Sequence, residues 1–408
     1  MGGRVGIIGA GISGLLACKY VLEKGFEPIV FESQPGVGGV WTHTPETTKL
    51  QSSKQAYEFS DFPWPCSVKE EYPDHNQVME YFESYALHFG LLPHIKFNTK
   101  VINIDYSVKQ GQDMLSWSHW GGTTDNCFSN PKGKWEITTT SATTVHHHLD
   151  QVHEVEFVIL CIGRFSGVPN IPEFAPNKGP DALVNGKVIH SMDYAAMDDY
   201  EATRFVKGKR VTIVGYQKSA LDMANECAIT NGAENPCTLL YRNLHWNIPA
   251  DYSPYTVLAA LYLNRFSELM LYKPGEGLFL RHLVTLLSPL RWAISKCVES
   301  YIKFKLPLKK YNLIPEHRFS ADVTSCSISI APKSFYDRVE DGSILLKKSK
   351  GFSFYASGLA FEDDAIAPLE TDIVILCTGY RGDSKLKNIF KSPTFQDYVS
   401  NSMVPLYR

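Results

Sequence analysis

The sequence VGIIGAGISG occupies residues 5–14 and carries the strongest structural signal in the chain. An apolar run leads into three glycines spaced G-x-G-x-x-G, and a helical pattern of apolar residues follows. This order predicts a strand, a tight turn and a helix. Gly9 is expected to let the chain turn, Gly11 to let the backbone approach a pyrophosphate, and Gly14 to let helix and strand pack closely. The first amides of the helix then face an anion.

A second strand and an acidic residue extend this pattern. The run Glu27–Phe31 predicts a strand that ends at Glu32, whose carboxylate is placed to accept hydrogen bonds from the two hydroxyls of a ribose. Strand, turn, helix, strand and acid in this order are typical of a dinucleotide-binding unit. The predicted binding residues of this unit are Gly9, Ala10, Gly11, Ile12, Ser13, Gly14 and Glu32.

A second unit of the same kind follows further along the chain. Arg210–Ala220 predicts a strand and a glycine turn, and the next strand, Cys237–Tyr241, ends at Arg242. A guanidinium at that strand end can pair with the 2′-phosphate of NADP, which is the interpretation we favour for Arg242. The alternative is that Arg242 is an ordinary surface arginine. Two further apolar runs, 155–163 and 371–380, each predict a buried parallel strand.

These patterns predict an α/β fold with two Rossmann-like dinucleotide-binding domains, the second inserted into the first. We expect the first part of the first domain over residues 1–180, the inserted domain over 181–335, and the return to the first domain over 336–408. The polar stretch 109–134 is expected to be an exposed loop. Residues 255–308 predict about three helices, broken near prolines, that either cover the core or an active site, or form a surface at a membrane interface or substrate entrance.

Composition excludes several classes of protein. With 408 residues, 44% of them hydrophobic, the chain suits two or three globular domains. A net charge of -3 and a pI near 6.5 give no reason to expect a nucleic-acid partner. The nine cysteines never show C-x-x-C spacing, which indicates a reducing compartment and argues against a zinc site or a redox-active disulfide.

Metal and membrane signals are also weak. The triplet His146–His148, with His153, is interpreted as a solvated loop, so no metal is predicted. No run of about 18 apolar residues predicts a transmembrane helix, although peripheral membrane contact stays open. Only four residues precede the first predicted strand, so no leader sequence is expected. The expected location is the cytoplasm, or the cytosolic face of the endoplasmic reticulum.

Several further motifs complete a resemblance to a known family. They include the glycine turn above, Gly38–Trp41, Phe59–Pro65, Gly186–Tyr194, Arg242–Pro249 and Cys377–Tyr380. Together they resemble the flavin-containing monooxygenases, which are class B flavoprotein monooxygenases, over essentially the whole chain. Residues 47–52 and 215–222 look most like the plant branch that includes the pipecolate N-hydroxylase.

The resemblance implies a dimethylaniline monooxygenase-type enzyme that holds FAD on the first unit and NADPH on the second. In that family NADPH reduces FAD, dioxygen adds at the flavin C4a atom, and the hydroperoxide oxygenates a nucleophilic nitrogen or sulfur of a small amine or sulfide. It implies catalytic roles for Gln51, as an amide near the flavin, and for His190, whose alternative role is to fix the domain hinge. Further implied cofactor-binding residues are Gly39, Val40, Trp41, Gln51, Ser52, Gly215, Gln217, Ser219, Ala220, Asp222, Arg242, Thr378 and Gly379.

The chain also departs from the family pattern. Val184 stands where the family places an aromatic residue, and Gln217 and Ala220 replace the middle and third glycines of the second turn. The chain ends about a hundred residues earlier than the family pattern, so the strand and helix that normally return to the flavin domain are expected to be missing. The alternative function is a truncated flavin- or nucleotide-binding relic without turnover. A pyridine nucleotide-disulfide reductase would need a cysteine pair that the sequence lacks.

Overall fold

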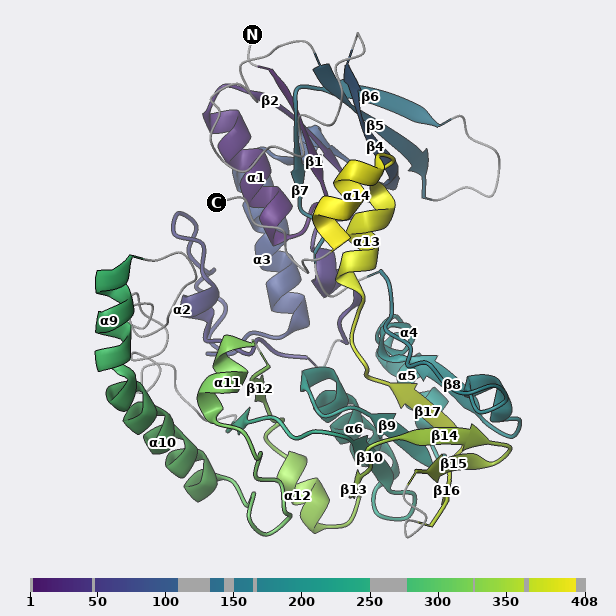
Figure 1. Ribbon diagram of the computed structural model, residues 1–408. Helices are drawn as coiled ribbons and strands as arrows, with labels where there is room; N and C mark the ends of the chain where they lie inside the picture. Colours follow the sequence, from purple (N-terminus) through teal and green to yellow (C-terminus); the bar gives the residue numbers. More distant parts are fainter. Residues whose placement is uncertain are drawn as a thin grey trace.

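The computed structural model describes residues 3–45, 48–108, 133–142, 150–163, 167–249, 277–325, 327–362 and 367–400. Two parallel sheets dominate the fold, and Figure 1 shows them as separate bodies joined by two crossings of the chain. The first sheet has strand order β3-β2-β1-β7 and the second has order β13-β10-β9-β17-β8. The predicted pair of Rossmann-like units, one inserted into the other, is confirmed.

The first sheet is built from the predicted N-terminal strands. Its strands are β1 (Arg4–Ile8), β2 (Glu27–Phe31), β3 (Ile95–Lys96) and β7 (Phe157–Leu160). Side chains alternate between its two faces, as the period of a strand requires. Val5 and Ile7 of β1 pack with the helices, whereas Ile8 packs with Ile137 on the opposite face.

Helices cover one face of the first sheet and a small antiparallel sheet covers the other. The elements on the helical side are α1 (Ile12–Glu23), η1 (Gly39–His43), α2 (Lys54–Tyr57), α3 (His75–His88) and η2 (Leu92–His94). The antiparallel sheet consists of β4 (Thr99–Val108), β5 (Gly133–Ser141) and β6 (Gln151–Val155). A capping box at Asp74, whose side chain accepts from the amide of Gln77, begins α3.

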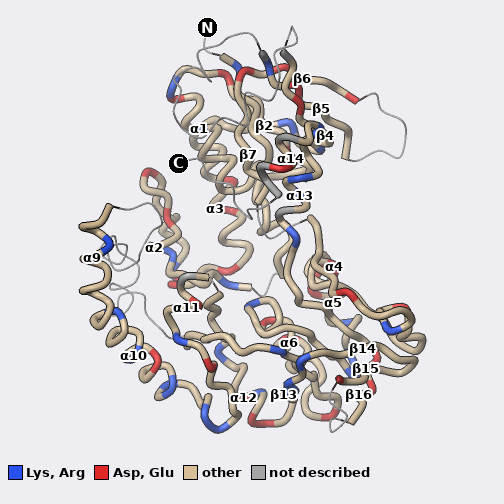
Figure 2. Tube along the Cα trace, in the orientation of Figure 1, with Lys and Arg blue, Asp and Glu red and all other residues tan. Residues whose placement is uncertain are grey.

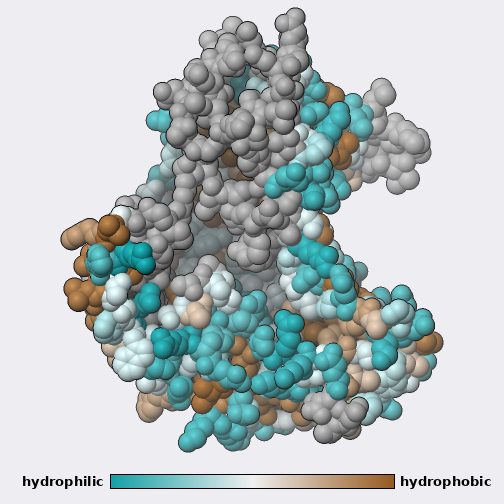
Figure 3. Space-filling model, in the orientation of Figure 1, coloured by the Kyte–Doolittle hydropathy of each residue, from teal (hydrophilic) through white to brown (hydrophobic). Residues whose placement is uncertain are grey.

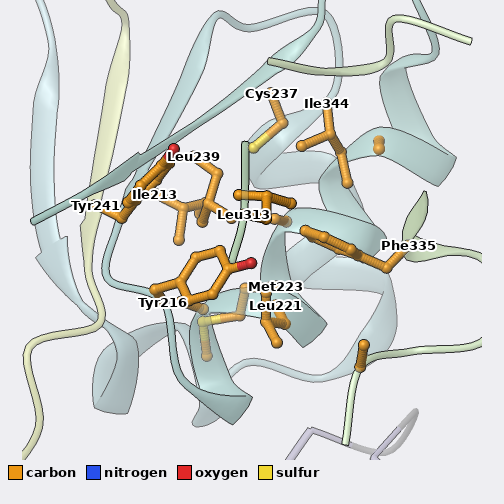
Figure 4. Packing of buried hydrophobic residues seen from close by; sticks show 14 of the residues in the cluster. Ile213, Tyr216, Leu221, Met223, Cys237, Leu239, Tyr241, Leu313, Phe335 and Ile344 are labelled. Atoms are coloured by element: carbon orange, nitrogen blue, oxygen red, sulfur yellow. The ribbon is translucent and has the colours of Figure 1, made fainter. Parts of the chain in front are cut away.

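The second sheet contains the strands of the second glycine turn and two later strands. They are β8 (Lys187–His190), β9 (Val211–Val214), β10 (Cys237–Tyr241), β13 (Ile344–Lys348) and β17 (Ile373–Leu376). One face packs on α6 (Lys218–Asn231) and α12 (Phe335–Glu340), where Leu221 and Phe335 lie in the same buried cluster as Leu239 of β10 (Figure 4). The other face packs on β14 (Phe352–Tyr355) and β15 (Gly358–Phe361), and β15 also pairs with β16 (Leu369–Glu370).

The remaining elements lie around the second sheet or return to the first. Those around the second sheet are η4 (Pro180–Ala182), α4 (Ser191–Ala195), α5 (Asp199–Val206), β11 (Asn247–Ile248), α9 (Leu278–Leu286), α10 (Ser288–Lys305), α11 (Phe319–Thr324) and β12 (Ser329–Ile330). The two that return to the first unit are α13 (Gly382–Ile389) and α14 (Pro393–Ser400). Phe390, which follows α13, packs with Ile104 of β4 and so anchors this return.

Two sequence predictions need correction. The run 155–163 is not one strand, because β6 and β7 belong to different sheets and Glu156 marks the corner between them. The Glu156 carboxylate accepts from the amide of Arg4 at 2.6 Å, which fixes that corner. The return expected at residue 336 is also too early, because β13 and β17 both pair within the second sheet. An apolar strand pattern predicts burial but does not say which sheet the strand joins.

Some predicted segments fall outside the described residues. These are residues 109–132 of the expected loop, the triplet His146–His148, and the first expected helix of 255–308. The other two helices of that stretch are α9 and α10, which meet at Leu287 just before Pro289. Among the described residues, no helix combines the length and the apolar character that a membrane span needs.

Candidate functional site

The first glycine turn sits at the carboxyl ends of the first sheet's strands, where α/β folds bind ligands. Gly9 has a φ of +103°, and a Cβ there would lie 2.5 Å from the carbonyl oxygen of Cys161. A Cβ at Gly14 would lie 1.8 Å from the carbonyl oxygen of Gly9. Both positions therefore require glycine, the first for the turn and the second for the contact between helix and strand, as predicted.

The second glycine of this turn faces another glycine. A Cβ at Gly11 would lie 3.3 Å from the Cα of Gly39, and a Cβ at Gly39, where φ is +60°, would lie 2.9 Å from the Cα of Gly11. The amide of Gly38 donates to the carbonyl oxygen of Ala10 at 3.2 Å. The predicted motif residues 38–41 therefore press directly on the first turn, although their spacing in the sequence did not reveal that contact.

The first helix presents its amino end to this turn. Gly11 is the N-cap of α1 and no side chain caps the helix, so its first amides are available to an anion. Ile12 is half-buried and Ser13 is exposed in that first turn. Val40 of η1 is exposed, while the indole of Trp41 donates to the Tyr57 hydroxyl at 3.1 Å.

Glu32 lies where the sequence predicted it, at the end of β2, and it holds the glycine turn in place. Its side chain is buried, with one carboxylate oxygen accepting from the amide of Ala10 at 2.7 Å. The other oxygen accepts from the amide of Gln34 at 2.9 Å. Two backbone donors thus fix the carboxylate beside the turn, in addition to the predicted role toward a ribose.

A half-buried lysine, Lys385, approaches the same sheet edge, and the sequence did not predict it. The ammonium of Lys385, on α13, donates to the carbonyl oxygen of Ile162 at 2.5 Å. Burial lowers the pKa of Lys385, and the nearby Glu32 carboxylate opposes that shift. Nothing in the local pattern around Lys385 distinguishes it from a solvated helix lysine, because only the fold brings α13 to this edge.

The second glycine turn has a similar backbone but different side chains. Gly215 has a φ of +141°, and a Cβ there would lie 2.6 Å from the carbonyl oxygen of Cys377. Ala220 is buried against this turn in the position of the third glycine. Gln217 is exposed as the N-cap of α6, and no side chain caps that helix. Ser219 is also exposed in the first turn of the helix.

Two charged residues flank the second turn. Asp222 pairs with Lys218 at 2.6 Å on α6. Burial raises the pKa of Asp222, and the Lys218 ammonium opposes that shift. Arg242 is exposed directly after β10, beside the end of β9. The Asp222 carboxylate is thus already neutralised within its helix, whereas the guanidinium of Arg242 faces solvent at the edge where a phosphate would bind.

The two crossings between the units are bonded to each other. The backbone amide of Asn170 donates to the carbonyl oxygen of Gly379 at 2.9 Å. The hydroxyl of Thr378 donates to the backbone carbonyl oxygen of Asn170 at 2.5 Å. Arg381 donates through its backbone amide to Val168 at 2.9 Å. Asn170 therefore bonds to both predicted residues of the return crossing, Thr378 and Gly379, a role that no sequence motif indicated.

His190 joins the same hinge. Its Nδ1 accepts from the amide of Met192 at 3.1 Å and its Nε2 lies 3.0 Å from the carbonyl oxygen of Gly379, so the ring is the neutral Nε2–H tautomer. Burial lowers the pKa of His190, which keeps it neutral. Both ring nitrogens are thus engaged by backbone groups, which is the geometry of the hinge-fixing alternative. The catalytic role stays a prediction without support from this geometry.

Gln51 connects the two units at a different point. It is exposed, and its side-chain oxygen accepts from the amide of Ile330 in β12 at 3.3 Å. Ser52 beside it is half-buried, and Ser53 is the buried N-cap of α2. The structure therefore brings Gln51 to the boundary between the two units, and its role near a flavin stays a prediction.

The surface outside these turns carries charged residues of both signs. Lys, Arg, Asp and Glu are interspersed over both units in Figure 2. Apolar side chains are exposed on α9 and α10, and Figure 3 shows hydrophobic residues gathered over α9. The most exposed of these are Leu278, Phe279, Leu286 and Phe304. Contact of this surface with a membrane stays a prediction.

Known proteins are similar to this chain over almost its whole length. Residues 2–386 match the family described as flavin-binding monooxygenase-like. The chain is 42% identical to the "Probable flavin-containing monooxygenase 1" of Arabidopsis thaliana, over 99% of this chain and 75% of that protein. It is 37% identical to the "Putative flavin-containing monooxygenase 2" of the same plant, over 99% of this chain and 78% of that protein.

Solved structures share the fold at much lower identity. The crystal structure of cyclohexanone monooxygenase from Rhodococcus sp. Phi1 bound to NADP+ has a TM-score of 0.62 and 17% identity, and the match covers 98% of this chain and 76% of that one. The sequence match to the family and the fold agree. This chain is therefore a member of the flavin-binding monooxygenase family.

Proposed function

We propose that this chain is an FAD- and NADPH-dependent monooxygenase that uses dioxygen to oxygenate a nucleophilic nitrogen or sulfur of a small metabolite. The observation that carries the proposal is the cradle formed by the first turn, where a Cβ on Gly39 would lie 2.9 Å from the Cα of Gly11 and Glu32 lies beside the turn. Only a backbone free of side chains lets a pyrophosphate approach the amino end of α1 so closely.

The residues present fit both cofactors by their chemistry. The exposed amides at the start of α1 suit the FAD pyrophosphate, and the Glu32 carboxylate suits its ribose. Arg242 suits the 2′-phosphate that distinguishes NADPH from NADH. Gln217 supplies a side chain where family members place a glycine, so the NADPH pyrophosphate is expected to lie further from the second turn than the FAD pyrophosphate lies from the first. Bound FAD would supply the redox chemistry, taking a hydride from NADPH and passing one oxygen atom of dioxygen to the substrate.

The chain's own contribution is to hold the two nucleotide sites in one arrangement. Asn170 and His190 bind the return crossing at Thr378 and Gly379, and Gln51 bonds to β12 across the boundary. These contacts would limit relative motion of the two units and restrict access of water to the boundary between them. His190 is neutral in this arrangement and serves as a positioning residue.

The proposal is tested with the purified chain loaded with FAD. NADPH oxidation, hydrogen peroxide and oxygenated product are measured together for a panel of alkylamines and thioethers. We expect product from at least one of these classes. If every substrate gave only hydrogen peroxide and no oxygenated product while NADPH was oxidised, the proposed N- or S-oxygenation would be contradicted.

A variant at the boundary sharpens this test. Gln51→Ala removes the contact with Ile330 and an amide at the boundary between the units, so we expect more hydrogen peroxide per NADPH. Gln55→Ala, an exposed position on α2, is the matched control and should couple like the unchanged chain. Equal peroxide yields in the two variants would remove Gln51 from the proposed site.

A further inference from the structure

Three metal-ligating side chains converge at a place that neither glycine turn uses. His245 lies between β10 and β11, His317 lies just before α11, and Asp322 lies on α11. One potential ligand atom from each lies within 4.8 Å of the others. These three residues are far apart in the sequence and their spacing matches no metal-binding motif, so no metal was predicted from them.

The two distances from Asp322 to the histidines suit a small divalent cation. The Oδ1 atom of Asp322 lies 3.0 Å from Nδ1 of His245 and 2.9 Å from Nε2 of His317. In a tetrahedral zinc site with bonds of about 2.0–2.1 Å, neighbouring ligand atoms lie about 3.3 Å apart. The two contacts therefore need to open by only a few tenths of an ångström.

The supporting hydrogen bonds are those that metal ligands require. Asp322 is 3% exposed, and its second oxygen accepts from the amide of Trp246 at 2.7 Å. The indole of Trp246 donates to the carbonyl oxygen of His317 at 2.9 Å. One buried tryptophan thus fixes both the carboxylate and the backbone of a histidine ligand. Such partners orient ligands and raise metal affinity.

One ring nitrogen in this cluster is shielded from solvent. The Nε2 atom of His317 lies 2.9 Å from Oδ1 of Asp322 and, among the described residues, forms no hydrogen bond of good geometry. A buried polar atom without a partner is costly, and an imidazole nitrogen in this state has a lone pair available for a cation. A cation held between His317 and Asp322 would give this nitrogen a well-directed partner.

We propose that His245, His317 and Asp322 bind one divalent transition-metal ion of the zinc class. Two imidazoles and one carboxylate are ligands that zinc accepts. The ion would cross-link the segment that follows β10 to α11. The site is independent of the proposed monooxygenase activity.

The test uses Co²⁺ and Zn²⁺ as probes on the full chain, with His146, His147 and His148 replaced by Gln to remove competing histidines. We expect one Co²⁺ per chain, seen by its visible absorption and displaced by Zn²⁺. His317→Gln should weaken binding at least about tenfold. His282→Gln, an exposed histidine on α9, is the matched control and should leave binding unchanged. Equal affinities in the two variants would overturn the site.

A second measurement needs no substitution in the cluster, so it holds even where His317→Gln fails to fold. Diethylpyrocarbonate modification is mapped by mass spectrometry with and without one equivalent of Zn²⁺. We expect Zn²⁺ to protect His245 and His317 by at least about fivefold in rate while His282 reacts as before. The absence of bound metal in the folded chain, or equal reactivity of all three histidines with and without Zn²⁺, would overturn the proposal.

Discussion

Replacement of Glu32 by Gln separates the role of its charge from that of its shape. The carboxylate accepts one backbone hydrogen bond on each oxygen, from Ala10 at 2.7 Å and from Gln34 at 2.9 Å. A glutamine side chain offers one oxygen and one NH₂ group, so one of the two backbone amides must face another donor. The buried turn then has an amide without an acceptor, whichever way the side-chain amide is oriented.

The size of the effect follows from the number of hydrogen bonds lost. Loss of one hydrogen bond to a charged group costs about 1.5–3 kcal/mol. For a unit of this size that corresponds to a fall of roughly 3–12 °C in the midpoint of its thermal transition. A ribose bound to the same carboxylate loses a similar free energy, so we expect the FAD dissociation constant to rise about ten- to a hundredfold.

Glu27→Gln is the matched control on the same strand. Glu27 is exposed, and its ion pair with Arg4 at 3.8 Å is a surface pair whose loss costs below about 1 kcal/mol. The assay compares the thermal midpoints of the two variants without cofactor and their FAD affinities by flavin fluorescence. The reasoning is refuted where Glu32→Gln and Glu27→Gln agree in both measurements.

Three other substitutions test the remaining parts of the account. Gly14→Ala places a Cβ 1.8 Å from a backbone oxygen, so it should lower the free energy of unfolding by about 3 kcal/mol and release most of the bound FAD. Gly36→Ala, with no atom within 4 Å of its Cβ, is the control and should leave both stability and FAD content unchanged in the same thermal and flavin assays. Arg242→Ala should lower the ratio of NADPH to NADH affinity about ten- to a hundredfold, and Arg204→Ala should leave the ratio unchanged in a binding titration. Burial lowers the pKa of His190, so the neutral ring stabilises the fold fully above about pH 6.5, and this stabilisation is lost as the pH falls through the lowered pKa. In thermal scans from pH 7.5 to 5, the midpoint of His190→Gln should therefore fall less steeply with decreasing pH than that of the unchanged chain.

Local patterns predicted much of the fold from the sequence. The strands Glu27–Phe31 and Cys237–Tyr241 end at the predicted residues because a charged residue follows each mainly apolar run. The position of Glu32 followed from its strand end. The need for glycine at positions 9 and 14 followed from the motif, because the positive φ of Gly9 and the contact of Gly14 with the carbonyl oxygen of Gly9 both lie within the turn.

The rest depends on contacts between distant segments, which periodicity does not report. The strand Ile373–Leu376 reads like any buried parallel strand, and only its pairing with β9 places it in the second sheet. Lys385 looks like a solvated helix residue until α13 packs near β7. Asp322 joins two histidines only because the segment after β10 meets α11. Each of these sites is made by tertiary structure.

The central claim is that the first glycine turn holds FAD and that the second delivers NADPH to it. The most direct measurement is an anaerobic titration of the flavin-loaded chain with NADPH, followed by the loss of oxidised flavin absorbance. The account predicts one FAD per chain, reduced by about one equivalent of NADPH and much more slowly by NADH. A folded chain that retains no FAD after reconstitution, or that retains FAD which NADPH does not reduce, would contradict it.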